Sequence, residues 1–221
     1  MLHHRLSVLA TLAIAALLQF PGSGARAGES FDAELDAVRE AWAVANYQVA
    51  KDQREAAFEK LGVRSAAFAD QHPTRPEALI WDGIVQSTYA GVNGGLGALG
   101  AAKRARARFE AALAIDGTAL DGSAYTSLGT LYHKVPGWPI GFGDDKKARQ
   151  LLEKALQINP AGIDANYFYG EFLFDNGEYA QALRYLETAQ KAPSRPGREI
   201  ADAGRQAEVR DLIARVRRKL G

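Results

Sequence analysis

The sequence predicts an all-α fold: a right-handed stack of antiparallel helical hairpins, closed by a C-terminal capping helix. Three observations lead to this prediction. Apolar residues recur three or four positions apart in successive segments, as on one face of a helix. A pattern of small and aromatic residues returns after about 34 residues. Prolines separate the segments, where they end helices.

The first 27 residues have the features of a secretory signal peptide. A weakly basic start ending at Arg5 precedes the apolar run Leu6–Phe20, and Ala25-Arg26-Ala27 is a cleavage motif of small residues. The apolar run has about 15 residues, which is short of the roughly 20 that a membrane-spanning helix needs. We therefore expect export, cleavage after Ala27 and one mature domain over residues 28–221.

The composition of the mature domain excludes several classes of protein. Removing the signal leaves 25 basic and 26 acidic side chains, so no overall charge attracts nucleic acid. The chain has no cysteine, which excludes disulfides and a lipid-anchored lipoprotein. No later segment is apolar enough to cross a bilayer. We expect a soluble exported protein of the bacterial periplasm without stable membrane insertion.

The domain is predicted to begin with a helical hairpin over residues 28–73. Its helices, 31–51 and 53–69, each carry apolar residues at helical spacing. The two prolines of His72–Pro76 end the second helix, because proline cannot continue a helix and restricts the residue before it.

The first repeat unit is predicted over residues 77–117. A helix over 77–90 contains Gly83, and its partner helix over 101–115 has the small-residue spacing of the repeat. We expect the glycine-rich stretch 91–100 between them to be a long flexible insertion.

This stretch also has the spacing G-x-G-x-x-G over Gly95–Gly100. A dinucleotide site with this motif requires a preceding β-strand, so that the following helix points its N-terminus at the pyrophosphate. A helix is predicted there instead. The motif is therefore interpreted as a loop between helices, and no cofactor is expected.

Two clearer units follow over residues 123–160 and 164–193, and a final helix over 199–220 is predicted to cap the stack. The second unit carries an insertion around Pro136–Gly143. The small residues and prolines that define the two units are Gly129, Ala148, Ala155 and Pro160, and Gly170, Ala182, Ala189 and Pro193.

These residues resemble the tetratricopeptide repeat, strongly over 123–193 and weakly over 77–117. The resemblance implies a non-enzymatic scaffold that holds a protein or peptide partner, or a small ligand, in its concave groove.

The interrupted units are also similar to the T component associated with certain bacterial TRAP transporters. Pro136-Gly137 followed by Gly143-Asp144 carries this likeness. It implies an alternative function as a transporter-associated ligand-binding component.

In repeats of this type the first helix of each unit lines the concave face, which makes its side chains the candidate binding residues. Trp138 and Phe142 of the insertion either form a pocket wall or pack on the neighbouring unit. The candidates on the helices are Ile84, Thr126, Thr130, His133, Tyr167 and Glu171, with Ile80, Ser87, Thr88, Ser123, Phe174 and Asp175 on the same face.

No catalytic or metal site is expected. The mature chain has only His72 and His133, lacks cysteine and has no Gly-x-Ser-x-Gly elbow. Glu171 and Asp175 share a helix face, which is common for exposed acidic pairs. An exported enzyme with an unrecognised site is the second alternative.

Overall fold

The computed structural model describes residues 23–221, and all regular secondary structure within this range is helical. The signal peptide predicted up to Ala27 lies mostly outside the described residues. The elements are α1 (Ser23–Tyr47), the short 3-10 helix η1 (Lys51–Gln53), α2 (Arg54–Gln71), α3 (Pro76–Asn93), α4 (Gly95–Ile115), α5 (Ala119–Lys134), α6 (Asp145–Ile158), α7 (Ile163–Asp175), α8 (Tyr179–Gln190) and α9 (Glu199–Leu220).

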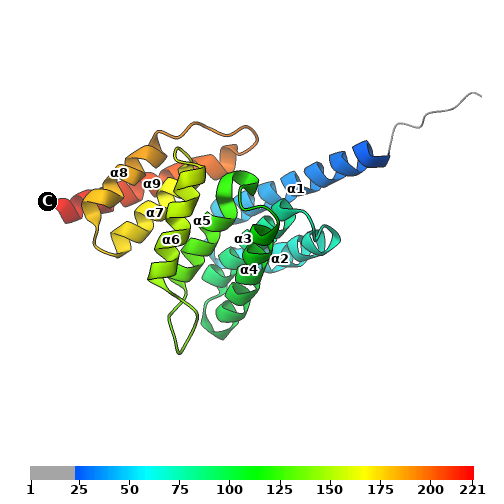
Figure 1. The fold of residues 1–221 in the computed structure, drawn as a ribbon, viewed down its shortest axis with the longest axis horizontal. Coiled ribbons are helices and arrows are strands. Elements are labelled where there is room, and N and C mark those ends of the chain that lie inside the picture. Colours follow the sequence, from blue (N-terminus) through cyan, green and yellow to red (C-terminus); the bar gives the residue numbers. More distant parts are fainter. Residues whose placement is uncertain (1–22) are drawn as a thin grey trace, which may run out of the picture.

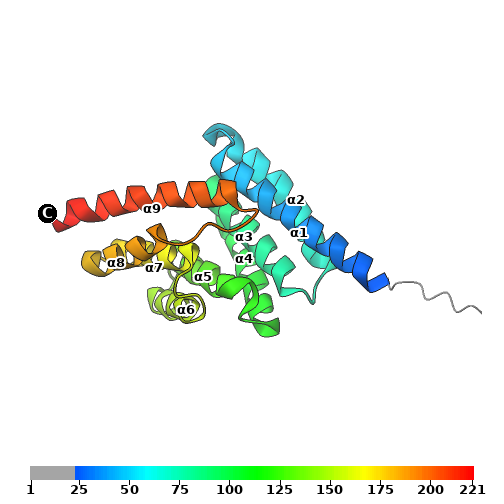
Figure 2. The same cartoon turned by 90° about the horizontal axis from the view of Figure 1, so that it is seen from above.

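Consecutive helices pack as hairpins, which confirms the predicted fold class of stacked helical pairs. The pairs α3/α4, α5/α6 and α7/α8 follow one another in the stack (Figure 1). The last helix, α9, begins beside α1 and runs along the stack to α8 (Figure 2). It therefore contacts α1, α7 and α8, helices from both ends of the chain.

The hairpins approach closely because a glycine lies at the crossing point of each pair. A Cβ added to Gly129 in α5 would lie 2.8 Å from Cγ of Leu152 and 3.1 Å from the carbonyl oxygen of Ala148, both in α6. These distances leave no room for a methyl group. Two other glycines approach the partner helix in the same way, Gly83 facing Phe109 and Gly170 facing Leu186.

The prediction of a flexible loop over residues 91–100 is wrong. Helix α3 continues to Asn93 and α4 begins at Gly95, so most of the stretch is helical. The turn between them is made by Gly94 and Gly95, whose φ angles of 66° and 59° lie in the left-handed region that glycine adopts easily. Each helical glycine costs about 1 kcal/mol relative to alanine, which the packing of α4 on α3 offsets.

Two helix starts also differ from the sequence prediction. Helix α1 begins at Ser23 rather than at Phe31. At α5 the residues Leu120, Asp121 and Gly122 have left-handed φ angles of 49°, 56° and 76°. Regular helix therefore follows Gly122, close to the predicted start of the second unit.

Helix α9 joins two hydrophobic cores. One core lies among α1, α2 and α3 and includes Ala201 from the first turn of α9. The other runs through α4 to α8 and includes four buried residues further along α9: Val209, Leu212, Ile213 and Val216. The helix fixes the N-terminal hairpin relative to the repeats.

We expect Gly129→Ala to destabilise the fold by about 1–3 kcal/mol, because the added methyl group forces α5 and α6 apart. Urea unfolding followed by circular dichroism measures the change. The matched control is Gly91→Ala in α3, where a Cβ would meet no atom within 4 Å. That substitution should be neutral or stabilising by up to about 1 kcal/mol. Equal effects of the two substitutions would contradict the close approach.

Candidate functional site

A cavity of about 530 Å³ lies between the first helices of the hairpins and the beginning of α9. Its lining comes from residues far apart in the sequence, from Trp42 in α1 to Arg205 in α9. Three kinds of side chain form its walls: aromatic and aliphatic groups, a row of hydroxyls, and a charged cluster.

Two tryptophans form the aromatic wall. The rings of Trp42 and Trp81 meet edge to face with centroids 5.9 Å apart, and both residues are buried in the surrounding protein. The indole Nε1 of Trp42 donates a hydrogen bond of 3.0 Å to Oγ1 of Thr88. These contacts give the wall a fixed shape.

The hydroxyl wall follows the first helices of two repeat units. Oγ of Ser87 and Oγ1 of Thr88 both donate to the carbonyl oxygen of Ile84, at 2.9 and 2.8 Å. Oγ1 of Thr130 donates to the carbonyl oxygen of Thr126 at 2.9 Å. Because these protons are used within the helices, the hydroxyl oxygens of Ser87 and Thr130 face the cavity mainly as acceptors.

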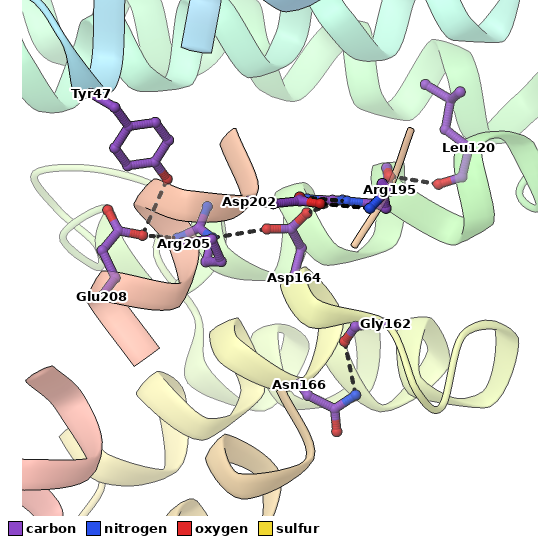
Figure 3. Close-up of polar contacts among 10 residues, drawn as sticks. Tyr47, Leu120, Gly162, Asp164, Asn166, Arg195, Asp202, Arg205 and Glu208 are labelled. Carbon is purple, nitrogen blue, oxygen red and sulfur yellow. Dashed lines mark hydrogen bonds and ion pairs between the residues drawn. The ribbon is translucent and has the colours of Figure 1, made fainter. Parts of the chain in front are cut away.

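The charged wall is centred on Asp164, in the first turn of α7. Its two carboxylate oxygens each accept a hydrogen bond of 2.8 Å, one from Arg205 and one from Arg195. Arg195 also donates to Asp202 from its side chain and from its backbone N–H, and Arg205 pairs with Glu208. Figure 3 shows these groups in a row, with Asp164 between the two arginines.

The protonation states of Asp164 and Tyr47 in this row are well defined. Burial alone raises the pKa of Asp164, but Arg205 and Arg195 outweigh that effect and lower the pKa from 3.8 to about 2. Tyr47 of α1 donates to Glu208 at 3.3 Å, and burial raises its pKa to about 12. The carboxyl of Asp164 is therefore ionised and Tyr47 is neutral at physiological pH.

The candidate residues do not all lie together. Ile84, Thr126 and Thr130 line the cavity, as do Ser87, Thr88 and Ser123 of the same predicted face. Tyr167 is buried instead under the guanidinium of Arg205, 4.5 Å from the ring centroid. The remaining candidates, His133, Trp138, Phe142 and Glu171, lie outside the lining, as do Ile80, Phe174 and Asp175.

His133 is engaged on both sides of its ring. Its Nδ1 lies 2.7 Å from Asp145 and its Nε2 lies 3.0 Å from Asp175, while Phe172 packs edge-on against the ring. Burial raises the pKa of Asp175, but Lys134 and His133 reverse the effect and lower it. With both nitrogens used, the imidazole has none free to take a proton from a substrate. Its geometry is that of a structural link between α5, α6 and α7.

Glu171 takes part in the same surface network. Its carboxylate lies 3.3 Å from Nζ of Lys134, which also pairs with Asp175 at 2.8 Å. Lys134 lines the cavity, but these acidic partners neutralise its charge. Glu171 therefore does not line the cavity itself, but it pairs with a residue that does, Lys134.

The insertion between α5 and α6 divides its apolar residues between two roles. Phe142 packs edge-on against Tyr132, with ring centroids 5.6 Å apart, and under the guanidinium of Arg106. Trp138, by contrast, is 90% exposed. The loop between α5 and α6, which projects from the stack in Figure 1, contributes three other residues to the cavity lining: Val135, Pro136 and Ile140.

Sequence reasoning missed the charged wall and the aromatic wall. Arg195, Arg198 and Arg205 line the cavity from the predicted capping helix or the segment before it, where the sequence pattern indicates only a cap. Trp42 and Tyr47 come from the N-terminal hairpin. Long-range packing of α9 on α1 brings the two groups together, and no local spacing signals it.

Within residues 23–221 no group of three or more His, Asp or Glu side chains is arranged to hold a metal ion. None of the helices described is long and apolar enough to span a membrane. The helices and the cavity together define a stack of helical hairpins around a cavity of about 530 Å³.

A family model for the tetratricopeptide repeat matches residues 140–196. The match covers α6, α7 and α8, and it confirms the resemblance seen in the sequence: the chain carries a tetratricopeptide repeat. The likeness to the T component of TRAP transporters is not shown by this match and stays a prediction.

No curated protein matches the chain. Among solved structures, one described as "Functional Characterization of Pseudomonas Aeruginosa pilF" is similar at 15% sequence identity and a TM-score of 0.36. That alignment covers 85% of this chain and 90% of the other.

Trp138 and Phe142 should respond differently to truncation. We expect Trp138→Ala to change stability by less than about 0.5 kcal/mol, because the side chain is exposed. Phe142→Ala should cost about 1–3 kcal/mol, which is less than for a fully buried ring because Phe142 is half-buried. Chemical unfolding of both variants checks this, and equal effects would contradict the division of roles.

Asp164→Asn should destabilise the fold by roughly 1–2 kcal/mol at pH 7. The value is modest because the side chain is 35% exposed and water screens its ion pairs. Since the pKa is lowered, the ionised group stabilises the fold above pH 3.8 and this effect fades as the pH falls to about 2. The gap between wild type and variant should close over that range in urea unfolding. The exposed control Asp211→Asn should stay within about 0.5 kcal/mol of wild type.

Proposed function

We propose that this protein is an exported, non-catalytic tetratricopeptide-repeat scaffold that binds a small ligand or a protein segment in the cavity described above. Repeat stacks of this kind present concave binding surfaces. Here the cavity is lined by the first helices of the units and by residues at the beginning of α9.

The cavity itself carries the proposal. Its volume of about 530 Å³ falls within the range of small-molecule sites, roughly 300–1,000 Å³. Its lining is mostly apolar, with a few convergent polar groups, which is the composition that gives such sites both affinity and orientation. A single side chain of a protein segment would also fit this volume.

Export is supported by the sequence of the first 27 residues, with its apolar run and small-residue cleavage motif. The absence of cysteine from the chain leaves no disulfide for an oxidising compartment to form. The periplasm is the location that we propose on these grounds.

A transporter-associated ligand binder is the second candidate, and a cavity of small-molecule volume favours it over a surface for long peptides. Its test is the gene neighbourhood, because a transporter component is expected beside the genes of its transporter. The absence of such genes would remove this candidate. An enzymatic function finds no support at His133, whose ring nitrogens are both engaged.

Filling the cavity should weaken binding. Ser127 lines it and makes no side-chain hydrogen bond to any residue that the structure describes. We expect Ser127→Phe to weaken binding of the neutral apolar dye Nile red by at least about tenfold, through lost apolar contact. Dye fluorescence measures the affinity, and Ser127→Ala, which leaves the cavity open, is the matched control. Equal dye binding by both variants, with both folded, would contradict the cavity as the site.

A further inference from the structure

Cationic side chains outnumber carboxylates in the lining of the cavity. Its lining includes four cationic side chains, Lys134, Arg195, Arg198 and Arg205, but a single carboxylate, Asp164. Three of the cations have acidic partners. Lys134 pairs with Glu171 and Asp175, and the guanidinium groups of Arg195 and Arg205 share Asp164 and each bind one further carboxylate.

Arg198 is the exception. Its side chain makes no ion pair and no hydrogen bond to any residue between 23 and 221. The guanidinium lies over the ring of Trp81, with Cζ 5.1 Å from the centroid. Burial lowers its pKa, and the neighbouring Arg195 lowers it further. Asp164 and Asp202 act on the guanidinium electrostatically in the opposite direction, but neither binds it directly. The protein thus carries a half-buried positive charge at the cavity without a direct ion-pair partner, a place that a ligand anion would complete.

The position of Arg198 is fixed by its backbone. Its N–H donates to the carbonyl oxygen of Arg195 at 3.1 Å, and its own carbonyl accepts from the N–H of Asp202 at 2.8 Å. Asp202 is in turn held by Arg195. The residue therefore sits at the start of α9 in a rigid polar frame, and only its side chain is free to meet a ligand.

A second unused donor belongs to the same wall. The indole Nε1 of Trp81 is buried and has no hydrogen-bond partner among the described residues. Trp81 is the ring over which Arg198 lies. The Arg198 guanidinium lines the cavity, whereas the Trp81 N–H is buried, so Arg198 is the unpaired donor that a ligand in the cavity can reach.

The remainder of the lining sets the character of the ligand. Trp42, Ile84, Leu99, Val135 and Phe168 offer an apolar surface along the cavity. One unpaired cation matches one negative charge. The carboxylate of Asp164 in the same wall would repel a doubly charged group such as a phosphate.

We propose that the cavity binds a small amphiphilic carboxylate, with its single carboxylate on Arg198 and its apolar body along the Trp42–Trp81 wall. This inference rests on the proposed function, because it names the chemical class of the cavity's ligand. Arginine suits the role, since its planar guanidinium can donate two parallel hydrogen bonds to one carboxylate.

Ligands that differ only in the head group test the inference. The full chain carrying Trp138→Phe leaves Trp42 and Trp81, both in the cavity wall, as its only tryptophans. Their fluorescence should report decanoate binding at least about tenfold tighter than decanol, the gain expected from a charge-assisted hydrogen bond. Decyl phosphate and decyltrimethylammonium should bind more weakly than decanoate.

Substitutions of Arg198 then test whether this residue causes the preference for decanoate over decanol. Arg198→Gln should weaken decanoate about tenfold or more and leave decanol unchanged, while Arg198→Lys should retain part of the preference. The matched control is Arg210→Gln, which removes an exposed charge from the same helix and should leave both affinities unchanged.

The outcomes separate the two proposals. If decanoate and decanol bind equally and Arg198→Gln alters neither, the carboxylate inference is overturned while cavity binding stands. Tighter binding of decyl phosphate than of decanoate would overturn the single-charge assignment. If none of these ligands and no Nile red binds, the proposed function fails together with the inference.

Discussion

The ion pair between Asp164 and Arg205 is the polar contact that places α9 on the repeat stack, and the cavity depends on that placement. It joins the first turn of α7, inside the repeat stack, to the second turn of α9, and Arg195 extends the contact to the segment between α8 and α9. Arg205 is almost fully buried, so its charge requires this partner. Burial lowers its pKa, but Asp164, followed by smaller contributions from Tyr47, Glu208 and Tyr167, outweighs that effect and raises it. The pair fixes where α9 lies across the hairpins.

The position of α9 in turn decides whether the stack encloses anything. A helix that only covered α8 would end the repeat and leave the inner face open to solvent. Here α9 begins beside α1, places Ala201 in the N-terminal core and continues into the second core through Val209. The cavity exists because this helix and the segment before it cover the first helices of the units.

The stacked hairpins were predictable from sequence because their cause is local. Gly129 and Gly170 are needed where two adjacent helices touch, and such contacts recur at a fixed spacing. Ile84, Thr126 and Thr130, which the same register assigns to the concave face, line the cavity. The prediction failed where tertiary contacts override local preference: the glycines of 95–100 are helical because α4 packs on α3. Arg198 could not be predicted as a lining residue, since its place depends on the return of α9 to α1.

The departures from the repeat, rather than the repeat, give the cavity its chemistry. Regular first helices contribute hydroxyl and aliphatic groups such as Thr130 and Ile84 that many repeat stacks could present. The tight turn at Gly94–Gly95 brings the start of α4 to the rim, and the insertion after α5 adds Val135 and Ile140. The chain before α9 supplies Arg198. Since a fold alone does not define a function, these irregular segments are where an unpaired charge could be added to the scaffold without disturbing the hairpin contacts that hold it together.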